Sequence, residues 1–169
     1  MEKRDELLKL FLDTFGFSVQ RLPGKAFELA LLLVCDPKTP GEILEILIRC
    51  DDPKLLERIA EHPNATSPVL ELLCEHPHPD VRAAVSENMN APREILLKLC
   101  DDPHPDVRYR LAENPCLSTD VLNKLAEDSN PYVAHRANST LLKLSRPEGA
   151  LRNLFQKISH GISQLRAVG

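Results

Sequence analysis

Apolar side chains recur along this chain at a fixed interval of 26 residues. Between residues 36 and 139 the sequence divides without gaps into four blocks, residues 36–61, 62–87, 88–113 and 114–139. Five positions of the block are apolar in every copy, and one is proline in every copy. By block position they are Ile43, Val69, Ile95 and Val121 (eighth); Leu44, Leu70, Leu96 and Leu122 (ninth); Leu47, Leu73, Leu99 and Leu125 (twelfth); Pro53, Pro79, Pro105 and Pro131 (eighteenth); Leu55, Val81, Val107 and Val133 (twentieth); and Ile59, Val85, Leu111 and Ala137 (twenty-fourth). A period of this length indicates a stack of repeated structural units.

The first half of each block predicts an amphipathic helix. In the third block, Ile95 and Leu99 lie four residues apart, which places them on one face of a helix. Pro92 stands where the first helical turn tolerates a residue without an N–H. The pair Asp102-Pro103 ends this helix, because the residue before a proline is pushed out of the α region.

The second half of each block predicts a shorter helix. In the third block it begins at Pro105 and places Val107 and Leu111 on one face. Asp106 lies in its first turn, where a negative charge suits the helix dipole. Asn114, which precedes another proline, ends it. A helix of eight or nine residues is not stable alone, so neighbouring blocks must stack and turn the apolar positions into ladders.

Residues 1–35 predict an N-terminal helical cap. We expect helices over residues 2–15 and 25–35, on either side of a hinge around Pro23. Leu33 falls at the twenty-fourth position of the repeat frame, so the second of these helices is interpreted as half a repeat.

Residues 140–169 predict a C-terminal helical cap. The repeat stops here, and an apolar stripe typical of a longer helix follows, formed by Leu151, Leu154, Phe155, Ile158, Ile162 and Leu165. We interpret this helix as a cover for the last ladder. The alternative is a helix that docks on a partner or on a second copy of the chain.

The block sequence resembles the leucine-rich repeat variant family. Its pattern is Asn-Pro-x-x-Pro-x-x-x-Leu-x-x-Leu-Ala-x-Asp-x-x-x-x-Val-Arg-x-x-Val-Ala, and its closest copies here are NMNAPREILLKLCDDPHPDVRYRLAE and NPCLSTDVLNKLAEDSNPYVAHRANS. The resemblance covers residues 36–139 and implies an all-α, right-handed superhelical solenoid of the HEAT and armadillo kind, in which α-helices alternate with short, partly 3₁₀ helices. We therefore expect a single domain with helical caps over residues 1–35 and 140–169. One type of member carries an iron–sulfur domain with clustered cysteines. No cysteine precedes Cys35 here, so no cofactor is predicted.

Cysteines and histidines fall in structural positions of the block. Cys74 and Cys100 share the thirteenth position, which also accepts Ile and Ala and is interpreted as core. His78 and His104 share the seventeenth position, each before a Pro-Asp pair. Metal binding by the two histidines is the alternative to a role in turns and helix caps, and the Asp and Asn in the same column of the other blocks favour the cap. No metal site and no disulfide framework are predicted.

Arginines recur on the short helices and form the predicted contact surface. One interpretation is a network of arginine–carboxylate pairs between blocks. The other is an exposed basic and aromatic strip, because an outward Tyr flanked by Arg is typical of interface hot spots. The strip comprises Arg82, Arg108, Tyr109, Arg110, His135 and Arg136.

Charge narrows the choice of function. Residues 36–139 hold 11 Lys and Arg against 19 Asp and Glu, a net charge of −8, whereas residues 140–169 hold five basic residues and one acidic residue. Nucleic-acid binding draws most of its affinity from basic surfaces, so the array disfavours it. The chain carries no phosphate loop, GxSxG elbow or HExxH motif, so no catalytic residue is predicted.

These features favour a non-enzymatic protein–protein interaction scaffold in a bacterial cytoplasm. The N-terminus contains no apolar run of membrane-spanning length, so no membrane association is expected. The first alternative is a nucleic-acid-binding helical-repeat protein that uses the arginine strip. The second is a metal or redox protein that uses the histidines and cysteines.

Overall fold

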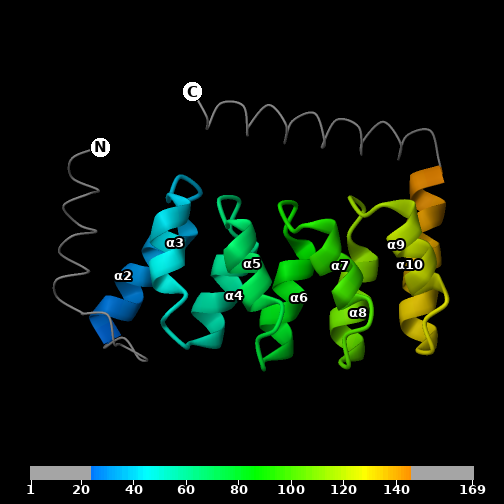
Figure 1. Ribbon diagram of the computed structural model, residues 1–169, viewed down its shortest axis with the longest axis horizontal. Coiled ribbons are helices and arrows are strands. Elements are labelled where there is room, and N and C mark those ends of the chain that lie inside the picture. Colours follow the sequence, from blue (N-terminus) through cyan, green and yellow to red (C-terminus); the bar gives the residue numbers. More distant parts are fainter. Residues whose placement is uncertain (1–23, 146–169) are drawn as a thin grey trace. The chain divides into compact units, whose positions relative to one another are not determined.

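The computed structural model describes residues 24–145, and all of the regular structure in that span is helical (Figure 1). The chain forms two compact units, Met1–Ile95 and Leu96–Gly169. In each unit, the helices of successive blocks pack against one another, as in a helical repeat solenoid. The predicted all-α repeat fold is therefore confirmed. The helices predicted over residues 2–15 and 151–165 lie outside the described residues.

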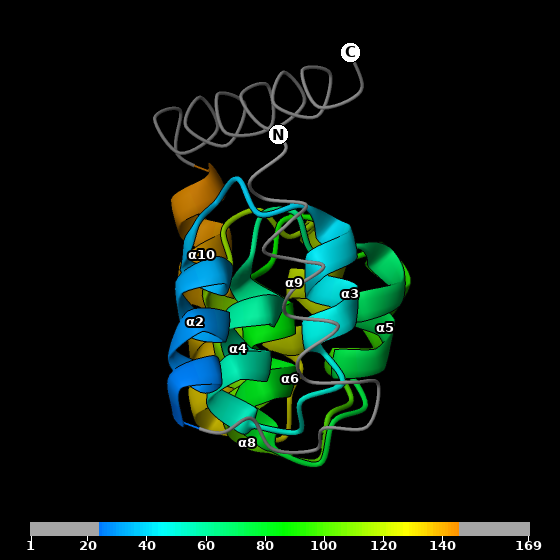
Figure 2. The same ribbon diagram turned by 90° about the vertical axis from the view of Figure 1, so that its left-hand side faces the viewer.

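Unit 1 consists of two rows of helices. The helix α2 and the second helices of the first two blocks, α4 and α6, pack one after another, and the first helices of these blocks, α3 and α5, lie on the other side of them (Figure 2). The helix α7 begins in this unit and crosses into the next. Their bounds are α2 Gly24–Cys35, α3 Gly41–Leu47, α4 Pro53–Glu61, α5 Ser67–Leu73, α6 Pro79–Glu87 and α7 Arg93–Leu99.

Unit 2 continues the same alternation. It contains α8 Pro105–Glu113, α9 Thr119–Ala126 and α10 Pro131–Ser145, and α10 packs against both α8 and α9. At 15 residues, α10 is longer than α8, which has nine. It extends beyond residue 139, where the predicted block ends.

The second helix of each block begins at the proline of the eighteenth position, as predicted. The prediction that it is the shorter helix is wrong: α4, α6 and α8 have nine residues and α10 has 15, whereas α3, α5 and α7 have seven and α9 has eight. The first helix ends early because turns with backbone hydrogen bonds between residues three apart follow it. The helix α7, however, ends at Leu99, before the Asp102-Pro103 pair. The following backbone N–H groups of Asp101 and Asp102 bond to carbonyls three residues earlier, so a tighter turn completes the helix before the proline.

The apolar columns form the core. Of their residues, Leu96 is half-buried and the others are buried, which confirms the predicted ladders. The half-repeat differs by one residue. Leu33 is half-buried, and the buried stripe of α2 is formed by Ala30 and Val34 instead. Its buried stripe therefore starts one position later than in α4, whose buried residues include both the twentieth and the twenty-first positions.

Polar side chains at the first position of the block fold the turn between blocks. In each block this side chain accepts a hydrogen bond from the backbone N–H two residues later, as an Asx turn does. The acceptors are Asp36 Oδ1, His62 Nδ1, Asn88 Oδ1 and Asn114 Oδ1, at 2.9, 3.0, 2.7 and 2.9 Å. Histidine fits this column because the Nδ1 of its neutral ring can accept a hydrogen bond.

The same column also links one block to the preceding one. His62 Nε2 lies 3.0 Å from the carbonyl oxygen of Asp36, and Asn88 Nδ2 donates to the carbonyls of Ala60 and His62 at 2.6 and 3.0 Å. Thr140 directly follows the fourth block and so continues the same column, and its Oγ1 donates to Ala112 O at 2.7 Å. The residues joined are 26 to 28 positions apart. These bonds satisfy buried carbonyls near helix ends and tie the blocks together at the sequence period.

Candidate interaction surface

The six residues predicted to form a contact surface lie on the helices α6, α8 and α10. Arg82 lies on α6 in unit 1. The others lie on the neighbouring helices α8 and α10 in unit 2. Those on α8 are Arg108, Tyr109 and Arg110, and those on α10 are His135 and Arg136.

Arg82 and Arg108, which share the twenty-first block position, bond to the turn before their own helix. Arg82 Nη1 donates to the carbonyls of His76 and Pro77 at 2.8 and 3.0 Å. Arg108 Nη1 donates to the carbonyl of Asp102 at 2.6 Å. Arginine at this position therefore holds the turn between the two helices of a block.

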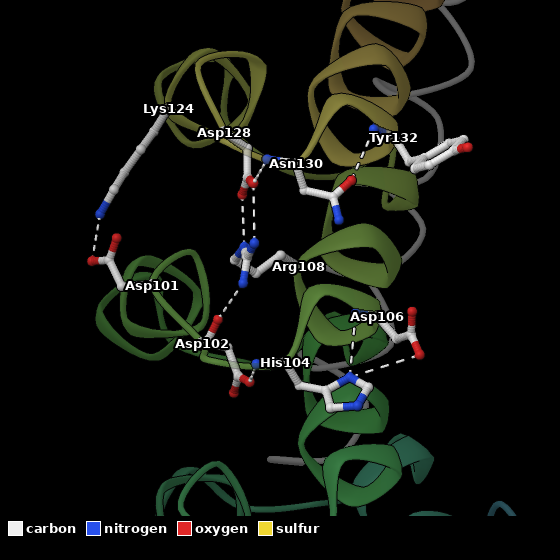
Figure 3. Close-up of polar contacts among 9 residues, drawn as sticks. All are labelled: Asp101, Asp102, His104, Asp106, Arg108, Lys124, Asp128, Asn130 and Tyr132. Atoms are coloured by element: carbon white, nitrogen blue, oxygen red, sulfur yellow. Dashed lines mark hydrogen bonds and ion pairs between the residues drawn. The ribbon is translucent and has the colours of Figure 1, made fainter.

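Arg108 also forms an ion pair that is almost enclosed (Figure 3). Its Nε donates to Asp128 Oδ2 at 2.7 Å and its Nη2 to Asp128 Oδ1 at 3.1 Å, and the two side chains are only 14% and 6% exposed. The hydrogen bond from Arg108 lowers the pKa of Asp128, and the same bond raises the pKa of Arg108. This pair belongs to the arginine–carboxylate network that was the other interpretation of the arginine columns.

A surface hollow of about 520 Å³ lies beside this ion pair in unit 2. Its rim carries a second, exposed pair in which Lys124 Nζ lies 2.6 Å from Asp101 Oδ2 (Figure 3). Cys100 also lines the hollow, and burial raises the pKa of its thiol to about 11. The thiol is protonated at neutral pH, so it is neither a ready nucleophile nor a ready metal ligand.

Arg136 is held less completely than Arg108. Its Nη2 lies 2.9 Å from Glu113 Oε1, and the two side chains are 30% and 38% exposed. The guanidinium carbon lies 5.9 Å from the centroid of the Tyr109 ring, within the range of a cation–π contact. Its Nε is buried and has no hydrogen-bond acceptor. Arg136 therefore joins α10 to α8 while one of its donors stays unused.

Tyr132 belongs to this surface but was not among the predicted residues. Its side chain is 76% exposed and lies one helical turn before Arg136, near the exposed His135. Figure 3 shows its ring directed away from the Arg108–Asp128 pair. The sequence contained a signal for this, because the same block position holds Lys54, Asp80 and Asp106, which are residues typical of an exposed position.

The histidines and cysteines occupy structural places. His104 Nδ1 accepts the N–H of Asp106 at 3.3 Å, which is helix capping, and Nδ1 of His78 lies 3.5 Å from Asp80 Oδ2. Cys74 and Cys100 are buried, and all five cysteines are free thiols. Among residues 24–145, no group of three or more His, Cys, Asp or Glu side chains is placed so that it could hold a metal ion.

Comparison with known proteins identifies the repeat. Residues 79–104, a span of one period, match the family model described as Leucine rich repeat variant. No curated protein and no solved structure matches the chain. In the part of the chain that the structure describes, no helix combines the length and apolar character needed to cross a bilayer.

Proposed function

We propose that this chain, in which residues 79–104 are a Leucine rich repeat variant repeat, is a non-enzymatic scaffold for protein–protein interaction in the cytoplasm. Stacked helical repeats expose an extended surface that needs no catalytic centre to bind a partner. The observation that carries the proposal is the exposed face of α8 and α10. It presents Tyr132, His135 and Arg110 to solvent, with Tyr109 and Arg136 half-buried between the two helices.

The composition of this face supports the proposal. Tyr and Arg are enriched at binding hot spots, because both cover large areas and also offer polar groups. Of the six residues predicted from sequence, Tyr109, Arg110, His135 and Arg136 form the proposed contact surface in unit 2. Arg108 holds a turn of unit 2 and Arg82 holds a turn of unit 1, and neither belongs to this surface, since their guanidinium groups are bonded within the chain.

Affinity capture from a native cell lysate tests the scaffold function. The bait carries Tyr109→Ala together with Arg110→Glu, and we expect it to lose partners that the unaltered chain captures. The matched control is Arg58→Glu, which changes an exposed arginine at the same block position as Arg110. If the double variant is folded by circular dichroism and retains every partner, this face is not the contact surface.

The observations do not favour the nucleic-acid alternative. Arg82 and Arg108 donate to carbonyl or carboxylate groups of the chain, and residues 36–139 carry a net charge of −8. Phosphate binding requires cationic groups that are available to replace counterions. The protein-binding proposal has no such requirement.

A further inference from the structure

The charges on α8 and α10 point to the chemistry of the partner. We propose that this face of unit 2 binds a protein segment that carries carboxylate side chains, with Arg136 as its anchor. The inference rests on the scaffold function proposed above and specifies the class of partner for the same surface.

The helix α10 is the most cationic element of this face. Its 15 residues, PYVAHRANSTLLKLS, include Arg136 and Lys143 and no acidic residue. Tyr132, Arg136, Ser139 and Lys143 follow one another at spacings of four, three and four, which places them along one face of the helix. Tyr132 and Lys143 are exposed, and Arg136 and Ser139 are half-buried. Residues 36–139 carry a net charge of −8, whereas this stripe carries the two cations Arg136 and Lys143 and therefore attracts negative charge.

Arg136 and Arg108 differ in how many of their hydrogen-bond donors are available to a partner. Arg108 directs Nε, Nη1 and Nη2 to acceptors within the chain and is 14% exposed. Arg136 pairs with Glu113 through Nη2, its Nε is buried without an acceptor, and both members of that pair are about one-third exposed. An unsatisfied buried donor costs free energy in the resting arrangement, and relieving it offsets part of the cost of turning the guanidinium away from Glu113.

A carboxylate is the group that can accept the unused hydrogen bond of Arg136. If the guanidinium turns outward, a carboxylate accepts from Nε and one Nη together, in the bidentate geometry typical of arginine–carboxylate pairs. Tyr109 lies under the guanidinium, and the exposed ring of Tyr132 lies one turn away to cover the apolar part of the segment. Lys143 lies further along the same stripe and suits a second carboxylate.

Selection of peptides tests the partner class directly. Random dodecapeptides displayed on phage are selected on the full-length chain, on Arg136→Gln and on Arg58→Gln. Arg58 shares the block position of Arg136, but it pairs with Glu61 of its own helix. We expect Asp and Glu to be enriched with the unaltered chain and with Arg58→Gln, and this enrichment to disappear with Arg136→Gln. Lack of acidic enrichment with the unaltered chain, or unchanged enrichment with Arg136→Gln, overturns the proposal.

The affinity for the most enriched peptide measures how much Arg136 contributes to binding. Fluorescence anisotropy of the fluorescein-labelled peptide should show a Kd at least about tenfold weaker for Arg136→Gln, because a charge-assisted bidentate pair is lost. Arg58→Gln should change Kd less than about twofold, as expected for an exposed charge away from the site. Circular dichroism confirms that each variant is folded.

A competitor separates a protein segment from a nucleic acid. Single-stranded DNA of the same length should not displace the labelled peptide. If DNA displaces the labelled peptide as effectively as the unlabelled peptide does, the proposed class of partner, an acidic protein segment, is wrong. The two proposals can fail separately. If the peptide selection shows no acidic enrichment but Tyr109→Ala with Arg110→Glu still abolishes capture of lysate partners, only the carboxylate chemistry proposed here is rejected. Full retention of lysate partners by that double variant rejects the scaffold surface itself.

Discussion

Single polar side chains decide how each block of this protein is joined to the next. His62 is buried, receives the N–H of Asn64 on Nδ1 and faces the carbonyl of Asp36 with Nε2. This use of both nitrogens requires the neutral tautomer that carries its proton on Nε2. The equivalent Asn88 makes the same two kinds of contact with its amide oxygen and nitrogen. A histidine in this column is therefore a structural substitute for asparagine.

We expect His62→Leu to destabilise the chain and His62→Asn to be tolerated. Leucine leaves the Asn64 N–H and the Asp36 carbonyl without their side-chain partner, which costs about 1–3 kcal/mol for an unsatisfied buried group. Asparagine restores both bonds. Urea denaturation followed by circular dichroism measures the difference. Equal stability of His62→Leu and the unaltered chain would show that the polar ladder is dispensable.

The Arg108–Asp128 pair predicts a dependence of stability on pH. The pKa of Asp128 is lowered in the folded chain from its ordinary value of 3.8. Its stabilising contribution is therefore present above pH 3.8 and disappears as the pH falls through the lower, folded value. We expect Asp128→Asn to cost about 2–3 kcal/mol at pH 7, because removing one charge leaves Arg108 unpaired in an enclosed site. The cost should shrink below pH 3.8.

The exposed pair on the same hollow supplies the control for this experiment. Asp101 and Lys124 are 70% and 45% exposed, so Asp101→Asn should cost less than about 1 kcal/mol at any pH. Denaturation curves at pH 7 and pH 3 compare the two variants. A pH-independent loss in Asp128→Asn would contradict the role given to this ion pair.

At the scale of helices, the spacing between the first two blocks depends on a glycine at the start of α3. Gly41 begins α3, and a Cβ atom placed there would lie 2.9 Å from Thr66 Cγ2 and 3.0 Å from the carbonyl oxygen of Asn64. Thr66 is itself held by a hydrogen bond from its Oγ1 to Glu45 Oε1 at 2.9 Å. The turn before α5 therefore approaches α3 closely, and only glycine leaves room for it.

We expect Gly41→Ala to destabilise unit 1 by about 1–3 kcal/mol, the usual cost of overpacking. This exceeds the gain of up to about 1 kcal/mol that alanine brings to a helix. Gly24→Ala is the matched control, because Gly24 begins α2 and has no atom within 4 Å of its added Cβ. Thermal unfolding should show a lower midpoint for Gly41→Ala only. An unchanged midpoint would mean that the turn before α5 can move away.

At the scale of the whole molecule, the 26-residue period appears in the long-range hydrogen bonds as well as in the apolar columns. Side chains at the first block position reach carbonyls 26 to 28 residues earlier. In repeat proteins each unit depends mainly on its immediate neighbours, so the number of units can change without changing the fold. The period, rather than any single block, should then be the requirement for folding.

Deletion of one complete block tests this requirement. A chain without residues 62–87 keeps the frame, and we expect it to remain helical and to unfold cooperatively at a lower temperature. A chain without residues 62–74 loses half a period, which puts Leu and Val columns out of register, and we expect it to lose cooperative unfolding. Circular dichroism melts of both deletions give the comparison. Identical melts would show that the frame does not control folding.

The arrangement of the surface was only partly predictable, and Arg108 and Tyr132 illustrate why. The sequence left Arg108 open between an outward strip and a network of arginine–carboxylate pairs, and in the structure its guanidinium pairs with Asp128, 20 residues later in the chain. That pairing depends on how α8 packs beside the turn between α9 and α10. Tyr132 follows a proline in a column of polar residues, and its exposure was readable from the column alone. The contact surface as a whole remains a prediction.

The sequence by itself determined the period, the helical class of the described region, the starts of the second helix of each block and the buried columns. These properties depend on local causes, namely proline at the first helical turn and apolar spacing along one helix. The tertiary structure decided which polar side-chain groups form hydrogen bonds and ion pairs within the chain and which keep a donor without an acceptor. The guanidinium of Arg108 directs its nitrogens to acceptors within the chain, whereas Arg136 keeps a buried Nε without an acceptor, although both stand on the second helices of adjacent blocks. The groups that pair with such side chains come from other helices and turns. Whether an arginine donor remains available to a binding partner is therefore decided only when the helices pack.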